Sequence, residues 1–498
     1  MPRRIPIFYS ALLLTGVNLV LRVVGTSFQV YVSRQIGPGG VGLLQLVMSV
    51  GGLAMVAGMA GVRTAAMYLT AEELGRDRRG NVRWVLSGCF RYSLVCSVAV
   101  ALGLYLLAPQ IAMRWIGDVR TVAALRLFGA FLPVSCLCGV LTGYFTAAGR
   151  IGTLSAVEIA EQLLTMGITV GLLKHWAGQN AVRACLCVIL GSGLGGCLTL
   201  AALSLLRLAQ RQVTASKIPV ARRLRETALP LAAADVVRSG INTAENLMVP
   251  RRLALNPAVA SPLGAFGLVS GMVFPVLMFP ACILYALAEL LIPELARCAA
   301  AGSGRRIRYL VRRSLKTALL YGLIFGGLEV LLADWLCLGL YKSPEAARFL
   351  RLYALLIPML YCDAITDAMT KGLGQQKICV RYNILTSAMD VAFLYLLLPK
   401  YGMTGYFVSF FLTHLVNFGL SLRRLLKIAR VAVPLHIPML AAASALAAGW
   451  AGWQLSQPAL RCAAFVAALG SLLCLTGVLG REELNWVKGL LRPKNRPS

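Results

Sequence analysis

The segment TGVNLVLRVVGTSFQVYVSR, residues 15–34, is long and apolar enough to cross a bilayer, yet Arg22 lies near its middle. A spanning helix needs roughly 20 mostly apolar residues. Because a helix turns about 100° per residue, the polar side chains of this segment share one face. They are Thr15, Asn18, Arg22, Thr26, Gln29 and Ser33. A central arginine is costly in contact with lipid, so the stripe predicts a helix that faces a wet cavity or a partner helix.

The rest of the chain is equally apolar. Of its 498 residues 58% are hydrophobic and 14% are charged, and the mean hydropathy is +0.74. A soluble chain would carry about 25% charged residues. The composition therefore predicts an all-α polytopic membrane protein with about 14 transmembrane helices. The predicted spans are 7–33, 41–62, 84–108, 121–146, 152–173, 184–206, 229–250, 264–292, 314–333, 349–370, 378–398, 402–422, 434–455 and 460–480.

The net charge of +30 would suit a nucleic-acid partner, but the distribution of the basic residues argues for orientation instead. With the N-terminus in the cytoplasm, the cytoplasmic segments hold 33 of the 49 Lys and Arg residues, the outer segments hold 11, and five lie within spans. This excess follows the positive-inside rule. We expect a multi-pass protein of the plasma membrane with both termini in the cytoplasm and no nucleic-acid partner.

Catalytic and metal chemistry are not indicated. The loops are short, whereas a membrane-embedded polymerase commonly needs a large outer loop for its catalytic site. No phosphate-binding glycine loop with a lysine is present. The 14 cysteines fall mostly within predicted spans, and neither CLC pair (136–138 and 185–187) has a histidine nearby. We therefore expect no enzyme activity, no cofactor and no metal site.

A weak internal repeat divides the chain. VSRQIGPGGVGLLQLV (32–47) resembles VPRRLALNPAVASPLGAFGLV (249–269), and each copy leads through an apolar helix to a double-arginine loop. Parallel repeats with a site between them are a known transporter plan. We predict a six-helix bundle over 1–228, a second over 229–430, and two additional helices with a cytoplasmic tail over 431–498. Pro275, Pro280 and Pro293 predict a bent eighth span.

The seventh span repeats the polar stripe of the first. Asp235, Arg238, Asn242, Glu245 and Arg252 fall within about 100° of one another on a helix. The repeat places the first and seventh spans in equivalent positions, so Arg22 and Arg238 are predicted to line one cavity. The predicted site residues are Asn18, Arg22, Gln29, Arg34, Arg63, Arg238, Asn242, Arg251 and Arg252. Guanidinium groups stay charged and bind phosphate bidentately, so this cavity suits an anionic substrate.

The acidic residues of the seventh span allow two interpretations. Asp235 and Glu245 either gate the cavity and bind a coupling ion, or they neutralise Arg238 within the membrane. The residues alone leave both open.

Several motifs resemble one family. NLVLRVVGTSFQVYVSRQIGPGGVGLLQL (18–46), GMAGVRTAAMYLTAEE (58–73), VPRRL (249–253) and GLVSGMVFPVLMFPACILYALAELLIPELA (267–296) resemble the multidrug/oligosaccharidyl-lipid/polysaccharide flippase superfamily. Within its polysaccharide-transporter branch, the likeness is to stage V sporulation protein B and its relatives, cousins of the lipid II flippases. The resemblance implies two bundles around a central cavity, alternating access, an undecaprenyl-pyrophosphate-linked sugar as substrate, and a groove for its tail at the last two spans.

The resemblance also implies which residues of this chain correspond to the arginines of the family. The arginine of the family's first helix falls on Arg22, and the arginine that closes that helix falls on Arg34. Where the lipid II flippases have a further arginine–aspartate pair, this chain has Phe28 and Gln29, and Ser270 and Gly271 stand where they carry another arginine. These departures favour the sporulation-type branch.

The sequence thus predicts a flippase for a lipid-linked oligosaccharide in the bacterial plasma membrane, serving peptidoglycan or spore-cortex synthesis alongside cell-wall synthesis proteins. The alternative is a cation/drug antiporter of the same superfamily, which Asp235 and Glu245 keep open. A membrane glycosyltransferase is disfavoured by the short loops, and a scaffold that transports nothing would not depend on Arg22.

Overall fold

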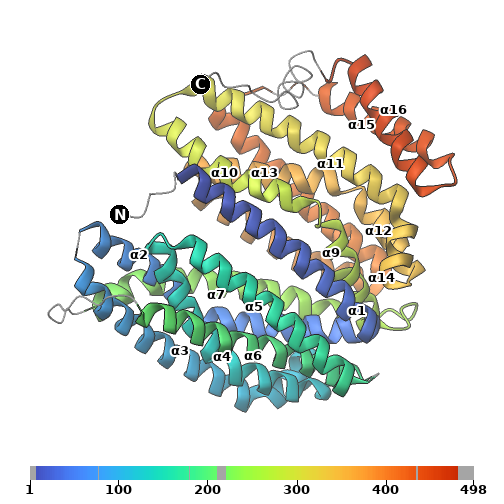
Figure 1. The fold of residues 1–498 in the computed structure, drawn as a ribbon. Helices are drawn as coiled ribbons and strands as arrows, with labels where there is room; N and C mark the ends of the chain where they lie inside the picture. Colours follow the sequence, from blue (N-terminus) through green and yellow to red (C-terminus); the bar gives the residue numbers. More distant parts are fainter. Residues whose placement is uncertain are drawn as a thin grey trace. The chain divides into compact units, whose positions relative to one another are not determined.

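The structure is a computed structural model, and it describes residues 7–76, 78–178, 180–209, 220–432, 434 and 436–479. The described residues form helices joined by short loops, without a β-strand (Figure 1). Eight of these helices are long and apolar enough to cross a membrane, or up to ten if each of two sharply bent pairs is one span. The predicted all-α membrane fold is confirmed, whereas the count of 14 stays a prediction.

Two helices are too long for one crossing, and a glycine divides each. α1 (Ile7–Met59) has 53 residues, about 80 Å at 1.5 Å per residue, against a hydrocarbon core of about 30 Å. It breaks at Gly37 (φ 69°, ψ 174°), and α14 (Gln376–Ala429) breaks at Gly402 (φ 56°, ψ −133°). Positive φ values favour glycine because it has no Cβ. The break at Gly37 lies between two predicted spans, and the break at Gly402 falls on the first residue of the predicted span 402–422.

Most other helices match a predicted span within a few residues, apart from extensions into the loops. They are α3 (Val82–Gln110), α4 (Val122–Ala147), α5 (Ile151–Leu172), α6 (Ala181–Leu208), α7 (Ala221–Leu253), α11 (Gly304–Tyr341), α15 (His436–Trp453) and α16 (Pro458–Leu475). Helix α2 (Val62–Gly75) matches no predicted span and lies in a predicted cytoplasmic loop. α11 begins ten residues before its predicted span.

Two predicted spans are broken helices. The eighth comprises α8 (Pro262–Leu268), a π-helical segment η5 (Val269–Val273) and α9 (Phe274–Leu277), followed at a 65° bend by α10 (Ala281–Ala300). The bend predicted from the prolines therefore falls at Pro280, while Pro293 lies inside α10. The tenth span, expected to be continuous, is α12 (Pro344–Ala354) and α13 (Ile357–Gly372), bent by 55°.

The contacts divide the chain into two compact units. Unit 1 comprises residues 1–275 and 387–409, and unit 2 comprises 276–386 and 410–498. In unit 1, α4 packs between α3 and α6, and α5 packs on α6, with a buried core on α2, α3 and α4 that includes Leu69, Val85 and Phe145. These units differ from the predicted bundles, whose boundary at residue 228 concerns the repeat and stays a prediction.

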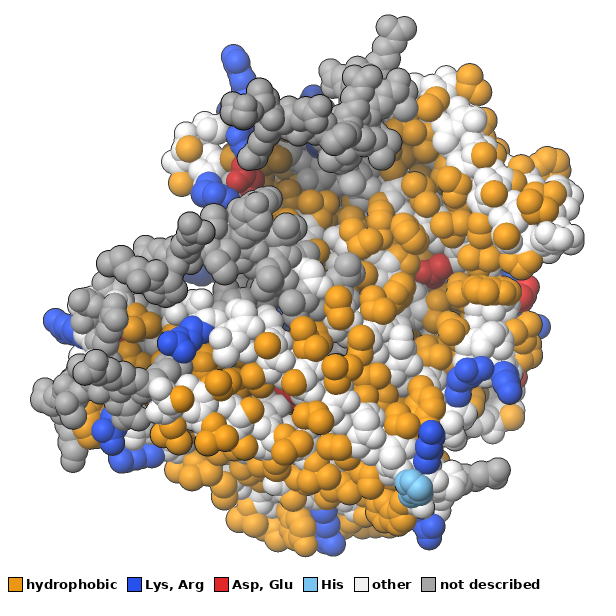
Figure 2. Space-filling model, viewed as in Figure 1, with side chains coloured by type: hydrophobic (Ala, Val, Ile, Leu, Met, Phe, Trp, Pro, Cys, Tyr) orange, Lys and Arg blue, Asp and Glu red, His pale blue; other side chains and the backbone are white. Residues whose placement is uncertain are grey.

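In unit 2, hydroxyl groups compensate the broken eighth span. Tyr361 donates to the Leu277 carbonyl (3.1 Å) and Tyr321 donates to the Pro280 carbonyl (2.7 Å). Carbonyls freed by a helix break need such partners where water is absent. α15 and α16 pack on α11 through an apolar cluster that includes Leu331 and Phe465 (Figure 1). Hydrophobic side chains also spread over the molecular face in Figure 2, as a bilayer requires.

Candidate functional site

Helix α7 is held against α1 by two hydrogen bonds to one residue. Thr243 donates its hydroxyl proton to the Ser49 carbonyl, and the Asn246 amide donates to the Ser49 hydroxyl, each at 3.0 Å. Polar side chains of this kind link helices in a bilayer. They fix the rotation of α7 and so determine which of its side chains face a cavity.

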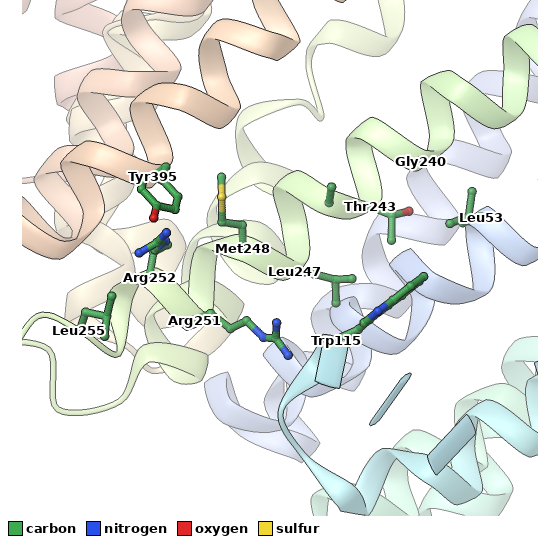
Figure 3. Close-up of a pocket in the computed structure, with 11 residues that line it drawn as sticks. Leu53, Trp115, Gly240, Thr243, Leu247, Met248, Arg251, Arg252, Leu255 and Tyr395 are labelled. Atoms are coloured by element: carbon green, nitrogen blue, oxygen red, sulfur yellow. The ribbon is translucent and has the colours of Figure 1, made fainter. Parts of the chain in front are cut away.

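A cavity of about 680 Å³ lies along the C-terminal half of α7 in unit 1 (Figure 3). Its walls are mainly apolar, and two adjacent arginines lie at one end. The lining residues are Leu53, Trp115, Gly240, Thr243, Ala244, Leu247, Met248, Arg251, Arg252, Leu255 and Tyr395. They come from α1, the π-helical segment η2 (Ile111–Ile116), α7, the loop just after α7, and α14. An apolar cleft with a few polar groups is typical of a ligand site.

Arg252 is positioned by an aromatic ring. Its guanidinium carbon lies 3.2 Å from the centre of the Tyr395 ring, and Figure 3 shows the two side chains together. Stacking leaves the donors at the edge of the guanidinium plane available for a bidentate contact with an anion. Arg251 reaches into the same cavity toward the side where Trp115 lies. The arrangement suits an anionic group that carries apolar or sugar surface.

The predicted binding residues Arg22, Gln29 and Arg34 of α1 lie outside this cavity. Arg22 and Arg34 are exposed at the protein surface. Gln29 reaches the Gly271 carbonyl at 3.5 Å, and Ser33 donates to the same oxygen at 3.3 Å. This part of the polar stripe therefore faces η5, which agrees with a partner helix. The side chain of Asn18 lies outside the described residues.

Three predicted arginine and asparagine residues also lie apart from the cavity. Arg238 and Asn242 are exposed on α7. Arg63, in the first turn of α2, is exposed and interacts electrostatically with Glu158 of α5. Of the nine predicted binding residues, the cavity brings together Arg251 and Arg252. A cavity shared by Arg22 and Arg238 stays a prediction.

The two predicted acidic residues behave differently from each other. Asp235 is exposed on α7. Glu245 is half-buried and faces α14, where it bonds Ser387 and interacts electrostatically with Asp390. Asp390 accepts a hydrogen bond from Ser409 at 2.6 Å. Glu245 and Asp390 are thus two carboxyl groups of unit 1 that interact electrostatically, and a role for Glu245 in ion coupling stays a prediction.

Sequence reasoning missed three residues of these sites. Trp115 and Tyr395 are single aromatic residues in apolar surroundings, so no spacing marks them. Asp390 is an acidic residue inside a predicted span, which is a signal that sequence alone provides. Among the described residues, no group of three His, Cys, Asp or Glu side chains is arranged to hold a metal ion.

Comparison with known proteins shows which sequences and folds this chain resembles. No family model matches the chain. The chain is 22% identical over 412 residues to stage V sporulation protein B of Bacillus subtilis (strain 168), which covers 80% of this chain and 79% of that protein. The predicted resemblance is therefore confirmed.

Solved structures of two membrane proteins resemble this chain in fold. The lipid II flippase MurJ in an inward closed conformation has a TM-score of 0.70 at 12% identity and covers 97% of this chain and 100% of its own. An inward-facing multidrug resistance MATE transporter of the MOP superfamily has a TM-score of 0.66 at 14% identity, covering 84% and 100%. The chain has the fold of these membrane proteins, which are named as a flippase and a transporter rather than as enzymes.

Proposed function

We propose that this protein is a flippase that moves an undecaprenyl-pyrophosphate-linked oligosaccharide across the bacterial plasma membrane by alternating access. The observation that carries the proposal is the pair Arg251 and Arg252 in an otherwise mainly apolar cavity. Two fixed cations suit a diphosphate, and aromatic walls suit a sugar ring. The similarity to stage V sporulation protein B supports a peptidoglycan or spore-cortex precursor as the substrate.

The size of the cavity is consistent with part of such a substrate. A volume of about 680 Å³ is that of a small-ligand site, so it accommodates the diphosphate and a portion of the first sugar. The polyprenyl tail stays in the bilayer. Both termini lie in the cytoplasm in the proposed topology, and cell-wall synthesis proteins would supply and consume the substrate.

Glu245 and Asp390 supply the proposed coupling. Two carboxyl groups that repel each other in a low-dielectric environment bind a proton or a sodium ion readily, because the ion relieves their repulsion. The same pair favours the second candidate function, a cation/drug antiporter, for which the MATE fold is a precedent. The sign of the charge around the 680 Å³ cavity distinguishes the two, since Arg251 and Arg252 would repel a cation.

The test is outward movement of a fluorescent undecaprenyl-pyrophosphate saccharide in proteoliposomes. Arg252→Ala removes a charge-assisted contact of about 1.5–3 kcal/mol and should slow transport ten- to a hundredfold. Arg252→Lys, which keeps the charge but loses the planar stack on Tyr395, should fall between. Arg348→Ala, an exposed arginine on α12, is the matched control and should transport normally.

Further variants separate the alternatives. Arg22→Ala and Arg238→Ala should abolish transport if the predicted cavity is used, and wild-type rates in both would refute that cavity. Exchange of an organic cation against protons or sodium, with the lipid substrate left in place, would establish the antiporter instead. Glu245→Gln should remove the dependence on an ion gradient in either case.

A further inference from the structure

One intramembrane arginine has no role in the proposed transport. Arg126 lies in the second turn of α4, and its guanidinium carbon is 4.9 Å from the centre of the Tyr105 ring on α3. Its side chain is half-buried, and its Nε atom is fully buried without a hydrogen-bond partner. Among the described residues, no carboxylate pairs with it.

An apolar groove is lined at one end by Tyr105, the ring on which Arg126 stacks. It has a volume of about 250 Å³ and runs between α3 and α4, lined by Val98, Leu102 and Tyr105 on one side and Gly129 and Pro133 on the other. The small residues Gly129 and Ala130 leave the recess because they fill little of the space between the helices. The groove is therefore continuous with the ring on which Arg126 stacks.

The groove opens toward the bilayer. Nearby residues of α3 leave large apolar side chains uncovered by protein, with Val95 70% exposed and Leu106 64% exposed. Tyr105 and Val98 are seven residues apart, so the groove extends about 10 Å along the helix axis from the charged end. The cation at one end of the groove suits a lipid headgroup. The apolar groove, about 10 Å long, suits the upper part of an acyl chain.

We propose that the groove between α3 and α4 binds a phospholipid with an anionic headgroup. Its phosphate accepts hydrogen bonds from Arg126, and one acyl chain lies along Val98 and Leu102. An unpaired guanidinium in a spanning helix requires an anion, and the lipid phosphate is the anion that the bilayer supplies at this depth. In the predicted topology this is the outer leaflet. The site does not depend on the proposed transport function.

The experiment compares lipid binding to the purified full-length protein in detergent by native mass spectrometry, with phosphatidylglycerol and phosphatidylcholine as probes. The wild-type protein should bind phosphatidylglycerol about tenfold more tightly, because both lipids offer a phosphate to Arg126 but the trimethylammonium group of phosphatidylcholine offsets the charge of its phosphate. Arg126→Gln should abolish that preference. Arg91→Gln is the matched control, since Arg91 is an exposed arginine on α3 that lies outside the groove, and it should leave the preference unchanged.

A second variant tests the groove without touching the charge. Ala130 is exposed at the groove, so Ala130→Phe fills the recess and should weaken the binding of both lipids several-fold. An unchanged preference in Arg126→Gln would overturn the proposal. Equal losses in Arg91→Gln and Arg126→Gln would also overturn it, because they would indicate unspecific attraction to positive charge. Displacement of the lipid by a second copy of the chain would identify the groove as a dimer interface instead.

Discussion

Replacing Arg223 with methionine should destabilise unit 1 by about 1.5–3 kcal/mol. Arg223, in the first turn of α7, donates to Glu73 (2.8 Å) and to Glu72 (2.6 Å) at the end of α2. Glu73 is only 1% exposed, and after the substitution it keeps one hydrogen bond, from Asn81 at 2.9 Å. The Arg223 side chain is 36% exposed and Arg78 still attracts Glu73, so the buried carboxylate loses one charge-assisted hydrogen bond rather than all of its compensation.

The loss should come from Glu73 rather than Glu72. Glu72 is partly exposed and keeps its ion pair with Arg76 at 2.9 Å. The neighbouring Arg222 supplies a matched control, because its side chain is 86% exposed and it pairs with Glu226, itself largely exposed. Arg222→Met should therefore change the free energy of unfolding by no more than about 0.5 kcal/mol.

The measurement is equilibrium unfolding in mixed micelles with increasing dodecyl sulfate. The double variant Arg223→Met with Glu73→Gln should recover most of the loss, since a neutral amide no longer leaves a charge buried. The reasoning is refuted if Arg223→Met and Arg222→Met differ by less than about 1 kcal/mol. It also fails if Glu73→Gln adds to the loss instead of reversing it.

Three further predictions concern stability. Gly267→Ala should cost about 1–3 kcal/mol in the same unfolding assay, because a Cβ there would overlap the backbone of α1, while Gly52→Ala, which meets open space, should be neutral or stabilising. Glu329→Leu should raise the thermal midpoint, because both carboxyl oxygens of Glu329 are buried without a hydrogen-bond partner among the described residues. A lower thermal midpoint in this variant would contradict the prediction. Asp118→Asn should destabilise the protein at pH 7 but not well below pH 3.8. The hydrogen bonds from Arg120 lower the pKa of Asp118 below its ordinary 3.8, so its contribution is present above that value and is lost as the pH falls through the folded pKa; a pH-independent difference in thermal midpoint would contradict this.

The membrane fold was predictable because its main signal is local. Hydrophobic runs separated by basic loops located helices from α1 to α16 within a few residues in most cases. The errors have local causes too. α11 begins early because its basic start, GRRIRYLVRRS, is a good helix sequence that needs no bilayer. The break before α13 follows from Pro358, in the first turn of that helix, because a proline there interrupts the hydrogen bonds of a continuous helix.

The candidate cavity could be predicted only in part. Arg251 and Arg252 were visible as a charged pair at the end of an apolar span, but Leu53, Trp115 and Tyr395 join them from distant parts of the chain. Packing between helices depends on side-chain shape rather than on periodicity, so a sequence pattern identifies the face of α7 but not what lies opposite it. The repeat suggested α1 as the partner, and α14 supplies the ring that holds Arg252.

The contacts of α7 with α14 place Arg252 of the proposed anion site and Glu245 of the proposed coupling pair along the same two helices. Glu245 contacts Ser387, and Arg252 contacts Tyr395, so the two helices run parallel over this stretch. Seven residues separate Glu245 from Arg252, about 10 Å along the helix. At an effective dielectric constant of about 20, unit charges at that distance interact with about 1.7 kcal/mol, more than a factor of ten in an equilibrium constant. In the proposed function, a change of charge at Glu245 should therefore alter the affinity of Arg252 for an anion about tenfold, which is sufficient for a coupling ion to control when the substrate is held and when it is released.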